Sequence, residues 1–356
     1  MTEAFINRIA TAVPPNDVHR PFLGFAQSLL EANERNAVLF GRMAERAGIE
    51  NRYSYLDPAW EPSGAWPSAR EFYTRGRFPS TAARMRLFER YAPALAAQAV
   101  ERLELGAERE RITHLIVTCC TGFSAPGLDL EIIARLSLPS SIERTMVGFM
   151  GCYAAINGLK LARHIVRSEP QARVLAINLE LCTLHLQESA DLDEILSFLI
   201  FSDGCAAALI TADPKGFAMD SFRAVLVPET GEMITWAIGD SGFNMFLSGQ
   251  VPVTILEALR TESDSILKGA GISAVDLWAV HPGGRSVLDA VERALELKPQ
   301  ALHHSREILR QYGNMSSATV MFVLEAMMRR ATPGQRGCAL AFGPGLSAES
   351  MRFVAA

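Results

Sequence analysis

The pattern of apolar and polar positions predicts short buried strands that alternate with amphipathic helices. Apolar side chains recur at helical spacing from Cys152 to Val166, whereas polar residues such as Lys160 fall on other faces. Continuous apolar runs predict buried strands at 114–120, 174–179 and 205–210. Further helices are expected over 80–103, with Ser80 as N-cap, and over 126–136. This alternation is typical of an α/β fold.

The second half of the chain repeats the order of the first. An offset of 162 positions lays the apolar segment 277–284 on 115–122, and it also aligns Asn314 with Cys152. We therefore expect two related halves, residues 1–213 and 214–356, that pack as a pseudo-two-fold pair. In that arrangement, Cys152 and Asn314 begin two symmetry-related helices near the axis. His281, at the end of a predicted strand, would stand beside them.

Composition narrows the class of protein. The chain has 356 residues, 49% of them hydrophobic, and a formal net charge of −5. It therefore lacks the excess of basic residues that is typical of nucleic-acid-binding proteins. It contains no apolar run long enough to span a membrane. The first residues lack the pattern of a signal peptide, so we expect a cytoplasmic protein. The six cysteines lack the paired spacing of a zinc site, which predicts reduced thiols and no metal.

Three residues form a candidate catalytic group. A cysteine in the first turn of a helix, such as Cys152, lies where backbone N–H groups stabilise the reactive thiolate. An imidazole from His281 would keep the thiol ionised, and an amide from Asn314 would help to hold an enolate oxygen. Taken singly, each has a structural alternative: a small buried core residue for Cys152, a strand-capping turn for His281 and a helix N-cap for Asn314. The shared register favours the catalytic interpretation.

Several motifs carry a family resemblance. They are Gly151-Cys152-Tyr153-Ala154, His281-Pro282-Gly283-Gly284, Gly313-Asn314-Met315-Ser316-Ser317-Ala318 and Phe342-Gly343-Pro344-Gly345-Leu346. With Phe201-Ser202-Asp203-Gly204 and an N-terminal block at 11–15, they span nearly the whole chain. Together they resemble the signatures of type III polyketide synthases, the chalcone synthase-like branch of the thiolase fold.

The resemblance implies a thiolase-like fold with a duplicated α-β-α-β-α layered core, and a homodimeric enzyme. Such an enzyme loads an acyl group from acyl-CoA, extends it iteratively with malonyl-CoA and releases a cyclised product. Coenzyme A thioesters are its substrates, and it needs neither a carrier protein nor a further cofactor. Cys152 would be acylated, while His281 and Asn314 would promote decarboxylation of the malonyl group.

The resemblance also implies a binding site for coenzyme A. Arg42 and Arg46 match two positions that contact its phosphates, whereas the third such position is Leu39 here. The resemblance also implies that coenzyme A contacts three further residues, Gly283, Gly284 and Ser316. Phe201 matches the gatekeeper at the junction of the coenzyme A tunnel and the cavity, and Met245 takes the place of its partner.

The space in which the chain grows is expected to be lined by Cys120, Thr121, His185, Trp236 and Ser316. Trp236 stands where plant enzymes carry glycine, which favours a fatty acyl starter and an alkylpyrone or alkylresorcinol product. Ala125 replaces a methionine that reaches the partner's cavity in plant relatives. Two alternatives stay open: a ketoacyl synthase III-like enzyme that performs one condensation, and a catalytically silent homologue that acts as a scaffold.

Overall fold

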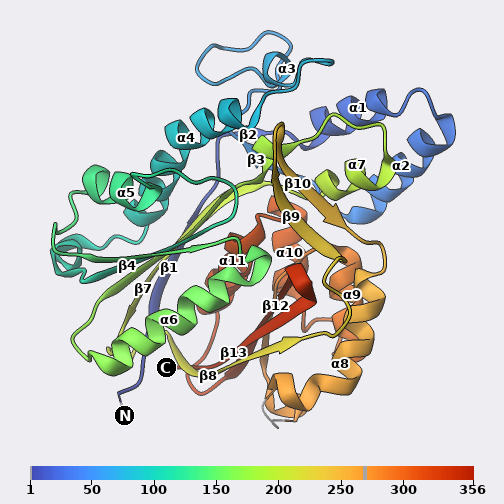
Figure 1. The fold of residues 1–356 in the computed structure, drawn as a ribbon. Helices are drawn as coiled ribbons and strands as arrows, with labels where there is room; N and C mark the ends of the chain where they lie inside the picture. Colours follow the sequence, from blue (N-terminus) through green and yellow to red (C-terminus); the bar gives the residue numbers. More distant parts are fainter. Residues whose placement is uncertain (1, 268–270) are drawn as a thin grey trace.

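A mixed β-sheet runs through the whole molecule. The computed structural model describes residues 2–267 and 271–356, and within them nine strands form a continuous sheet (Figure 1). In spatial order they are β11 (Leu277–Val280), β12 (Arg336–Gly343), β13 (Ser347–Ala355), β8 (Phe217–Leu226), β1 (Phe5–Ala12), β7 (Asp203–Thr211), β6 (Val174–Leu181), β4 (His114–Cys119) and β5 (Glu143–Gly148). The strands β1 and β8 pair only through Phe5 with Ala218 and Ile6 with Phe217, so the sheet consists of two leaves joined at one corner.

The two leaves have the same topology. In the first, β4 and β6 are parallel, β6 and β7 antiparallel, and β7 and β1 antiparallel. In the second, β11, β12, β13 and β8 follow the same sequence of directions. The offset that relates Cys152 to Asn314 also carries the bounds of β6 onto those of β12. The predicted duplication is therefore confirmed at the level of strands.

The copies differ at one strand. The same offset carries β5 onto residues 305–310, which belong to the helix α10 (His303–Tyr312). That segment buries Ile308 and Leu309 and places Glu307 and Arg310 three residues apart as an ion pair, which favours a helix. As a result, β5 forms the outer edge of the first leaf, and the second leaf has no counterpart of it among the described residues.

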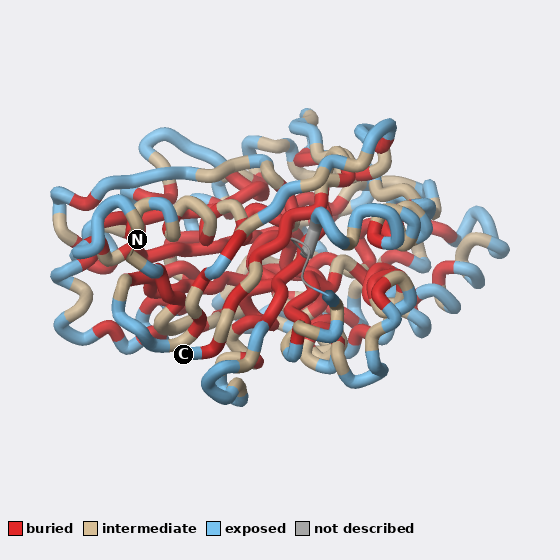
Figure 2. The backbone as a smooth tube through the Cα atoms, turned by 90° about the horizontal axis from the view of Figure 1, so that it is seen from below, coloured by how far each residue is buried: buried red, intermediate tan, exposed pale blue. Residues whose placement is uncertain are grey.

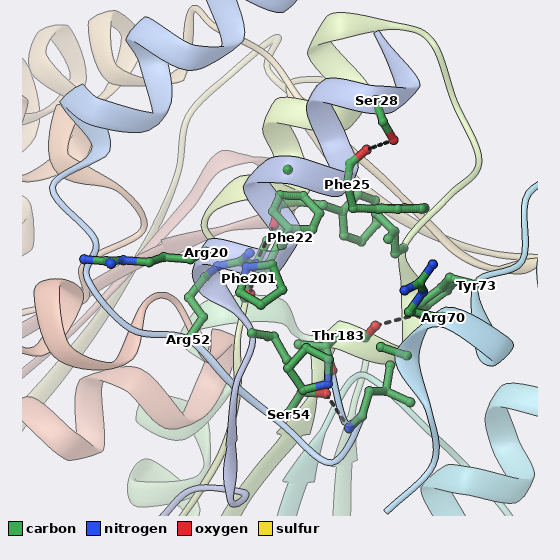
Figure 3. Close-up of a pocket in the computed structure, with 18 of the residues that line it drawn as sticks. Arg20, Phe22, Phe25, Ser28, Arg52, Ser54, Arg70, Tyr73, Thr183 and Phe201 are labelled. Carbon is green, nitrogen blue, oxygen red and sulfur yellow. Dashed lines mark hydrogen bonds between the residues drawn. The ribbon is translucent and has the colours of Figure 1, made fainter. Parts of the chain in front are cut away.

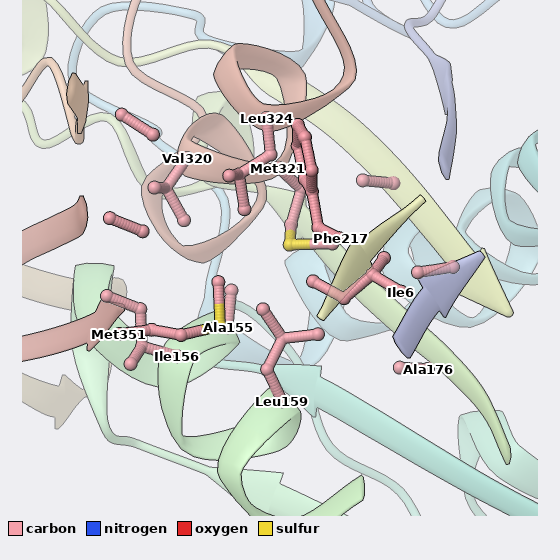
Figure 4. Close-up of a cluster of buried hydrophobic side chains, with 14 of the residues drawn as sticks. Ile6, Ala155, Ile156, Leu159, Ala176, Phe217, Val320, Met321, Leu324 and Met351 are labelled. Atoms are coloured by element: carbon pink, nitrogen blue, oxygen red, sulfur yellow. The ribbon is translucent and has the colours of Figure 1, made fainter. Parts of the chain in front are cut away.

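Two helices occupy the layer between the leaves. The helix α6 (Ala154–Ser168) contacts β4, β6 and β13, and α11 (Thr319–Met328) contacts β1, β7, β11 and β12. Both contribute to one apolar cluster, in which Ile156 and Leu159 of α6 lie near Met321 and Leu324 of α11 (Figure 4). The apolar positions that the sequence assigned to one face of α6 are buried there, as predicted.

Two outer layers complete the core. The helices α4 (Thr81–Glu101) and α5 (Leu128–Leu136) cover the first leaf, while α8 (Val251–Leu267) and α9 (Arg285–Ala294) cover the second (Figure 1). The backbone coloured by exposure has its buried positions along the strands and its exposed ones on the surrounding loops and helices (Figure 2). This is the layered α-β-α-β-α architecture that the resemblance implied.

The remaining elements lie near the ends of the strands. They are α1 (His19–Leu29), α2 (Glu34–Ala47), α3 (Ala69–Phe72), α7 (Leu192–Leu199), the pair β2 (Asn16–Asp17) and β3 (Tyr53–Ser54), and the hairpin β9 (Ile234–Gly239) and β10 (Gly242–Leu247). Ser80 caps α4 by accepting a hydrogen bond from the N–H of Ala83, as predicted. The segment from 50 to 79 is largely irregular, also as expected, apart from β3 and α3.

The glycine before the nucleophile position fixes the turn into α6. Gly151 has a φ of 75°, and a Cβ atom added there would lie 2.3 Å from Cδ of Pro344. Gly313, its counterpart before Asn314, has a φ of 69°. The duplication thus extends to the left-handed backbone conformation that glycine adopts most readily.

We expect Gly151→Ala to lower the free energy of unfolding by about 1–3 kcal/mol, because strain and the contact with Pro344 add together. Gly24→Ala in α1 is the matched control, since a Cβ atom there meets nothing within 4 Å and the helix should be slightly stabilised. Denaturant unfolding measures both. Equal stability of the two variants would contradict this account of the turn.

Candidate active site

The nucleophile position lies in a short helical turn ahead of α6. Cys152 belongs to the 3₁₀ turn Gly151–Tyr153, which follows β5 and leads directly into the helix. Its Sγ atom lies 3.7 Å from Oγ of Ser316. The preceding N–H of Gly151 donates to Sγ of Cys120 at 3.2 Å. A thiol from the first half and a hydroxyl from the second half therefore meet at the pseudo-two-fold axis.

The amide of Asn314 lies on the other side of the same axis. Its Oδ1 accepts a hydrogen bond from the N–H of Ser316 at 2.8 Å, and its Nδ2 donates to the carbonyl of Gly283 at 3.5 Å. A hydrogen bond from this side chain also acts on Cys152 and lowers the thiol pKa, although burial outweighs it. Asn314 thus links the cysteine to the loop after β11.

That loop carries His281. The imidazole is 1% exposed, and neither ring nitrogen has a hydrogen-bond partner among the described residues. A Cβ atom added to Gly283 would lie 3.7 Å from Nε2, so the small residue leaves room beside the ring. Burial lowers the pKa of His281 to about 3, which keeps the isolated ring neutral. Buried polar atoms are normally paired. The two unpaired ring nitrogens of His281 are therefore free to hydrogen-bond to a bound substrate.

Burial also governs the thiol. It raises the pKa of Cys152 to about 11, and the nearby carboxyl of Glu180 contributes in the same direction. The start of a helix therefore does not by itself ionise this cysteine, contrary to the simplest expectation from the sequence. A thiolate at Cys152 would therefore need a neighbouring base to take the proton.

Glu180 at the end of β6 is a functional candidate that sequence reasoning missed. The carboxylate is fully buried and accepts hydrogen bonds from the N–H of Cys120 at 2.9 Å, the hydroxyl of Thr121 at 2.9 Å and the hydroxyl of Ser317 at 2.5 Å. Burial raises its pKa to about 7 in spite of these donors. An acidic residue in an otherwise apolar strand was the signal in the sequence.

An aromatic wall closes the space next to these groups. Nε2 of His185 donates to the carbonyl of Thr121 at 2.7 Å, because its Nδ1 accepts from the N–H of Phe243 at 3.0 Å. Phe243, which sequence reasoning missed, stacks on the imidazole at 4.2 Å. Nε1 of Trp236 donates to the carbonyl of Cys120 at 2.8 Å. The structure thus brings the four predicted positions Cys120, Thr121, His185 and Trp236 together.

The two predicted gatekeeper positions belong to one cluster. Phe201 is buried, and Met245, which is opposite Trp236 in the β9–β10 hairpin, packs against the same apolar group. The main chain beside Phe201 pairs with that of Asn314: the N–H of Asn314 donates to the carbonyl of Ile200 at 2.8 Å, and the N–H of Ser202 donates to the carbonyl of Asn314 at 2.9 Å. Phe201 is thereby fixed next to Asn314.

The basic positions lie on a different surface. Arg42 and Arg46 are exposed on α2, one turn apart, and Leu39 on the same helix is 41% exposed. The carbonyl of Arg46 accepts a hydrogen bond from Nη1 of Arg285 at 3.2 Å. Arg285 is the first residue of α9, directly after Gly283 and Gly284. The fold therefore brings the two arginines to the glycine loop that carries His281.

Comparison with known proteins agrees with this geometry. The family model described as chalcone and stilbene synthases, N-terminal domain, matches residues 4–214, and the model of the C-terminal domain matches residues 218–355. The chain belongs to the chalcone and stilbene synthase family. As a member of this family, it is a type III polyketide synthase, a decarboxylating condensing acyltransferase, and such enzymes act on coenzyme A thioesters.

Individual members of the family resemble the chain over nearly its full length. The alpha-pyrone synthesis polyketide synthase-like Pks18 of Mycobacterium tuberculosis is 32% identical, over 99% of this chain and 91% of that protein. The structure of PKS-I from the brown alga Ectocarpus siliculosus is 31% identical, with a TM-score of 0.88 and coverage of 100% and 99%. The C-terminal type III polyketide synthase domain of Steely1 from Dictyostelium is 26% identical, with a TM-score of 0.88 and coverage of 99% of both chains.

Three further findings concern metal sites, membrane spans and cysteines in this synthase. In residues 2–267 and 271–356, no group of three or more His, Cys, Asp or Glu side chains is arranged to hold a metal ion. Over the same described part of the chain, no helix has the length and apolar character needed to cross a bilayer. All six cysteines are free thiols.

The pH dependence of Cys152 tests whether His281 takes its proton. A paired imidazolium would stabilise the thiolate against the burial that raises the thiol pKa, so loss of the imidazole should raise that pKa further. We expect the pH midpoint for alkylation by iodoacetamide to move upward by about 2 units or more in His281→Gln. His304→Gln on the surface helix α10 is the control. An unchanged midpoint in His281→Gln would exclude the pairing.

Proposed function

We propose that this synthase loads a fatty acyl group onto Cys152, extends it repeatedly with malonyl-CoA and cyclises it to an alkylpyrone or alkylresorcinol. The observation that carries the proposal is that Cys152 of the first half contacts Ser316 and receives a hydrogen bond from Asn314 of the second half, while Asn314 donates to the loop that holds a buried imidazole without a partner among the described residues. These groups supply a nucleophile, a base and an amide donor, which is what loading and decarboxylation require.

Loading begins with transfer of the Cys152 proton to His281. The sulfur then attacks the thioester carbon of acyl-CoA, the carbon–sulfur bond to coenzyme A breaks, and the leaving thiolate takes the proton from the imidazolium. This sequence leaves an acyl group on Cys152 and a neutral His281. Because burial disfavours both charged forms when each stands alone, the ion pair is stabilised mainly by the attraction of its two members.

Extension uses His281 again, now as a hydrogen-bond donor, together with Asn314. When malonyl-CoA loses carbon dioxide, negative charge develops on its thioester oxygen, and the N–H of His281 and Nδ2 of Asn314 stabilise it there. The resulting carbanion attacks the acyl carbon on Cys152, and the sulfur leaves as thiolate. Nδ2 of Asn314 is well suited to this because its present contact, the carbonyl of Gly283 at 3.5 Å, is long and easily exchanged.

Coenzyme A would bind along α2 and the start of α9. Arg42 and Arg46 supply two guanidinium groups for phosphates, and Gly283 and Gly284 allow a pantetheine arm to approach the loop closely. Leu39 contributes no charge at the third position. We therefore propose that phosphate recognition relies on fewer ionic contacts here than in relatives with three basic residues.

The wall of the cavity supports the choice of starter. The indole of Trp236, held by the carbonyl of Cys120, and the stacked His185 and Phe243 narrow the space on this side. Such a wall disfavours bulky aromatic starters and leaves room for a narrow aliphatic chain. The name of Pks18, which refers to alpha-pyrone synthesis, supports lactone formation as the closing step.

A homodimer is the proposed assembly. The outer strand β5 leaves one edge unpaired within the described residues, and its exposed side chains include Met146. Phe123 and Phe149 are 38% and 37% exposed beside it, with ring centroids 5.3 Å apart. An edge strand next to exposed aromatic rings is a surface that proteins usually cover.

Two substitutions separate the chemical steps. Cys152→Ala should form no acyl-enzyme from acyl-CoA, whereas Cys338→Ala, which removes a distant core thiol, should still form it. The intact mass of each variant measures this.

Asn314→Ala should still be acylated, but its rate of carbon dioxide release from malonyl-CoA should fall at least about 100-fold, because one oxyanion donor is gone. Asn244→Ala on β10 is its control. Normal decarboxylation by Asn314→Ala would remove the role of the amide.

The product profile tests the overall function. With acyl-CoA starters of two to sixteen carbons and malonyl-CoA, we expect triketide or tetraketide pyrones or resorcinols, with long aliphatic starters preferred. Trp236→Ala should shift the profile toward bulkier starters or more extensions, because the indole no longer limits the space. Mass spectrometry of the products measures this. A single condensation onto a malonyl carrier protein, without these products, would instead identify a ketoacyl synthase III-like enzyme.

A further inference from the structure

A cavity lies beside Phe201, the predicted gatekeeper position. It has a volume of about 750 Å³ and is enclosed by α1, the segment from 52 to 75, the turn Cys182–His185 and α7 (Figure 3). Among the described residues that line it, none is Cys152, His281 or Asn314. It is therefore separate from the catalytic groups, although Phe201 forms part of its wall. A volume of this size is typical of pockets that bind small molecules.

Most of the wall is apolar. Its apolar side chains include Phe22 and Phe25 from α1, Leu56, Leu186, and Phe198 and Phe201 at the end of α7. Several of them belong to one buried cluster with Tyr73, whose hydroxyl donates to the carbonyl of Thr183 at 2.6 Å. A cavity lined in this way binds hydrocarbon or aromatic surface by excluding water.

One buried cation interrupts this apolar wall. Arg52 is 2% exposed, donates through Nε to Nδ1 of His19 at 3.0 Å, and donates through Nη1 to the carbonyls of Phe198 at 3.0 Å and Phe201 at 2.7 Å. Its Nη2 atom is buried and has no hydrogen-bond partner among the described residues. The guanidinium also lies over the ring of Phe22, 4.4 Å from its centroid. A donor group is thus left unused in a cavity wall.

The charge of Arg52 is balanced only at a distance. Among the described residues, no carboxylate forms an ion pair within 4 Å of its guanidinium; Asp17 accepts a hydrogen bond from the main-chain N–H of Arg52 at 3.1 Å, and Asp17 and Asp203 act on the guanidinium from farther away. Asp203 already accepts hydrogen bonds from the N–H of Thr183 at 2.8 Å and from its hydroxyl at 2.7 Å. Burial lowers the pKa of Arg52 to about 9, so the side chain is still charged at neutral pH. A buried cation without a close counter-ion is costly unless an anion joins it.

We propose that this cavity binds an apolar carboxylate, with its carboxylate group on Nη2 of Arg52 and its aliphatic part against the phenylalanine side chains. A guanidinium offers parallel N–H groups that match the two oxygens of a carboxylate. Three more arginines line the cavity and are exposed, namely Arg20, Arg70 and Arg75; of these, Arg70 lies at the opposite side from Arg52 (Figure 3). They add positive potential near the opening and so favour the approach of an anion.

The position of the cavity gives such a ligand a defined neighbour. Phe201 separates it from the catalytic side, and the carbonyl of Phe201 is one of the two that Arg52 holds. The carboxylate would therefore bind to the same guanidinium that fixes the backbone of the gatekeeper position. This ligand does not react, and its binding requires neither Cys152 nor acyl transfer, so it can be measured independently of the proposed synthase activity.

Paired ligands test the charge at this site without altering the protein. Dodecanoate and dodecanol have the same chain length and differ in the head group. We expect calorimetric titration of the wild-type enzyme to show dodecanoate binding at least about tenfold more tightly, because only the carboxylate can pair with Arg52. Decanoate should bind more weakly than dodecanoate by about fourfold per methylene. Equal affinity of the alcohol and the carboxylate would overturn the proposal.

Paired variants test the location. Ala69 lines the cavity and packs against the same cluster. The Ala69→Trp enzyme should bind dodecanoate at least about tenfold more weakly, because the indole fills the cavity. Ala69→Ser should keep the affinity within about threefold. Alkylation of Cys152 with iodoacetamide should also leave it unchanged. Loss of binding after alkylation, or full binding by a folded Ala69→Trp enzyme, would place the ligand in the catalytic cavity and contradict the inference.

Discussion

The apolar packing of α6 and α11 between the two leaves is the constraint on which the rest of the structure depends. Both helices are surrounded by sheet on two sides, so neither can shift without exposing apolar surface at a cost of about 25 cal/mol per Å². Each begins just after a glycine with positive φ, at Gly151 and Gly313. The helix starts are therefore fixed relative to each other, and the side chains of Cys152 and Asn314 meet because the helices cannot move apart.

Burial then determines the chemistry at the meeting point. The same low exposure that holds the helices in place raises the pKa of the Cys152 thiol and lowers that of His281. Glu180 adds a third buried titratable group, whose two oxygens are occupied by donors from three residues. Without substrate, burial therefore favours the neutral thiol of Cys152 and the neutral imidazole of His281, each considered separately. In the proposed mechanism, charge develops only when Cys152 transfers its proton to His281.

Much of the fold could be predicted from the sequence because the duplication left a gap-free register. Apolar runs mark the strands, and a single offset relates Cys152 to Asn314. The contacts within the candidate active site are harder to predict from the sequence. The partners of Glu180 at Cys120 and Ser317 lie 60 and 137 residues away, so nothing local marks them. Phe243 stacks on His185 only because a hairpin folds back over the cavity. The helix that replaces a second β5 depends on ion pairs between side chains, which an apolar pattern does not capture.

The main-chain bridge between Phe201 and Asn314 limits how the entrance to the cavity can open. Two hydrogen bonds tie the backbone on either side of Phe201 to the residue that carries the catalytic amide. A hinge motion of this segment would therefore pull the amide out of position at the moment when it is needed. Under the proposed function, a growing chain would therefore pass by rotation of the phenyl ring and of the flexible thioether of Met245, and not by movement of the main chain. Because Phe201 is buried, its ring can turn only when the apolar side chains packed around it also move.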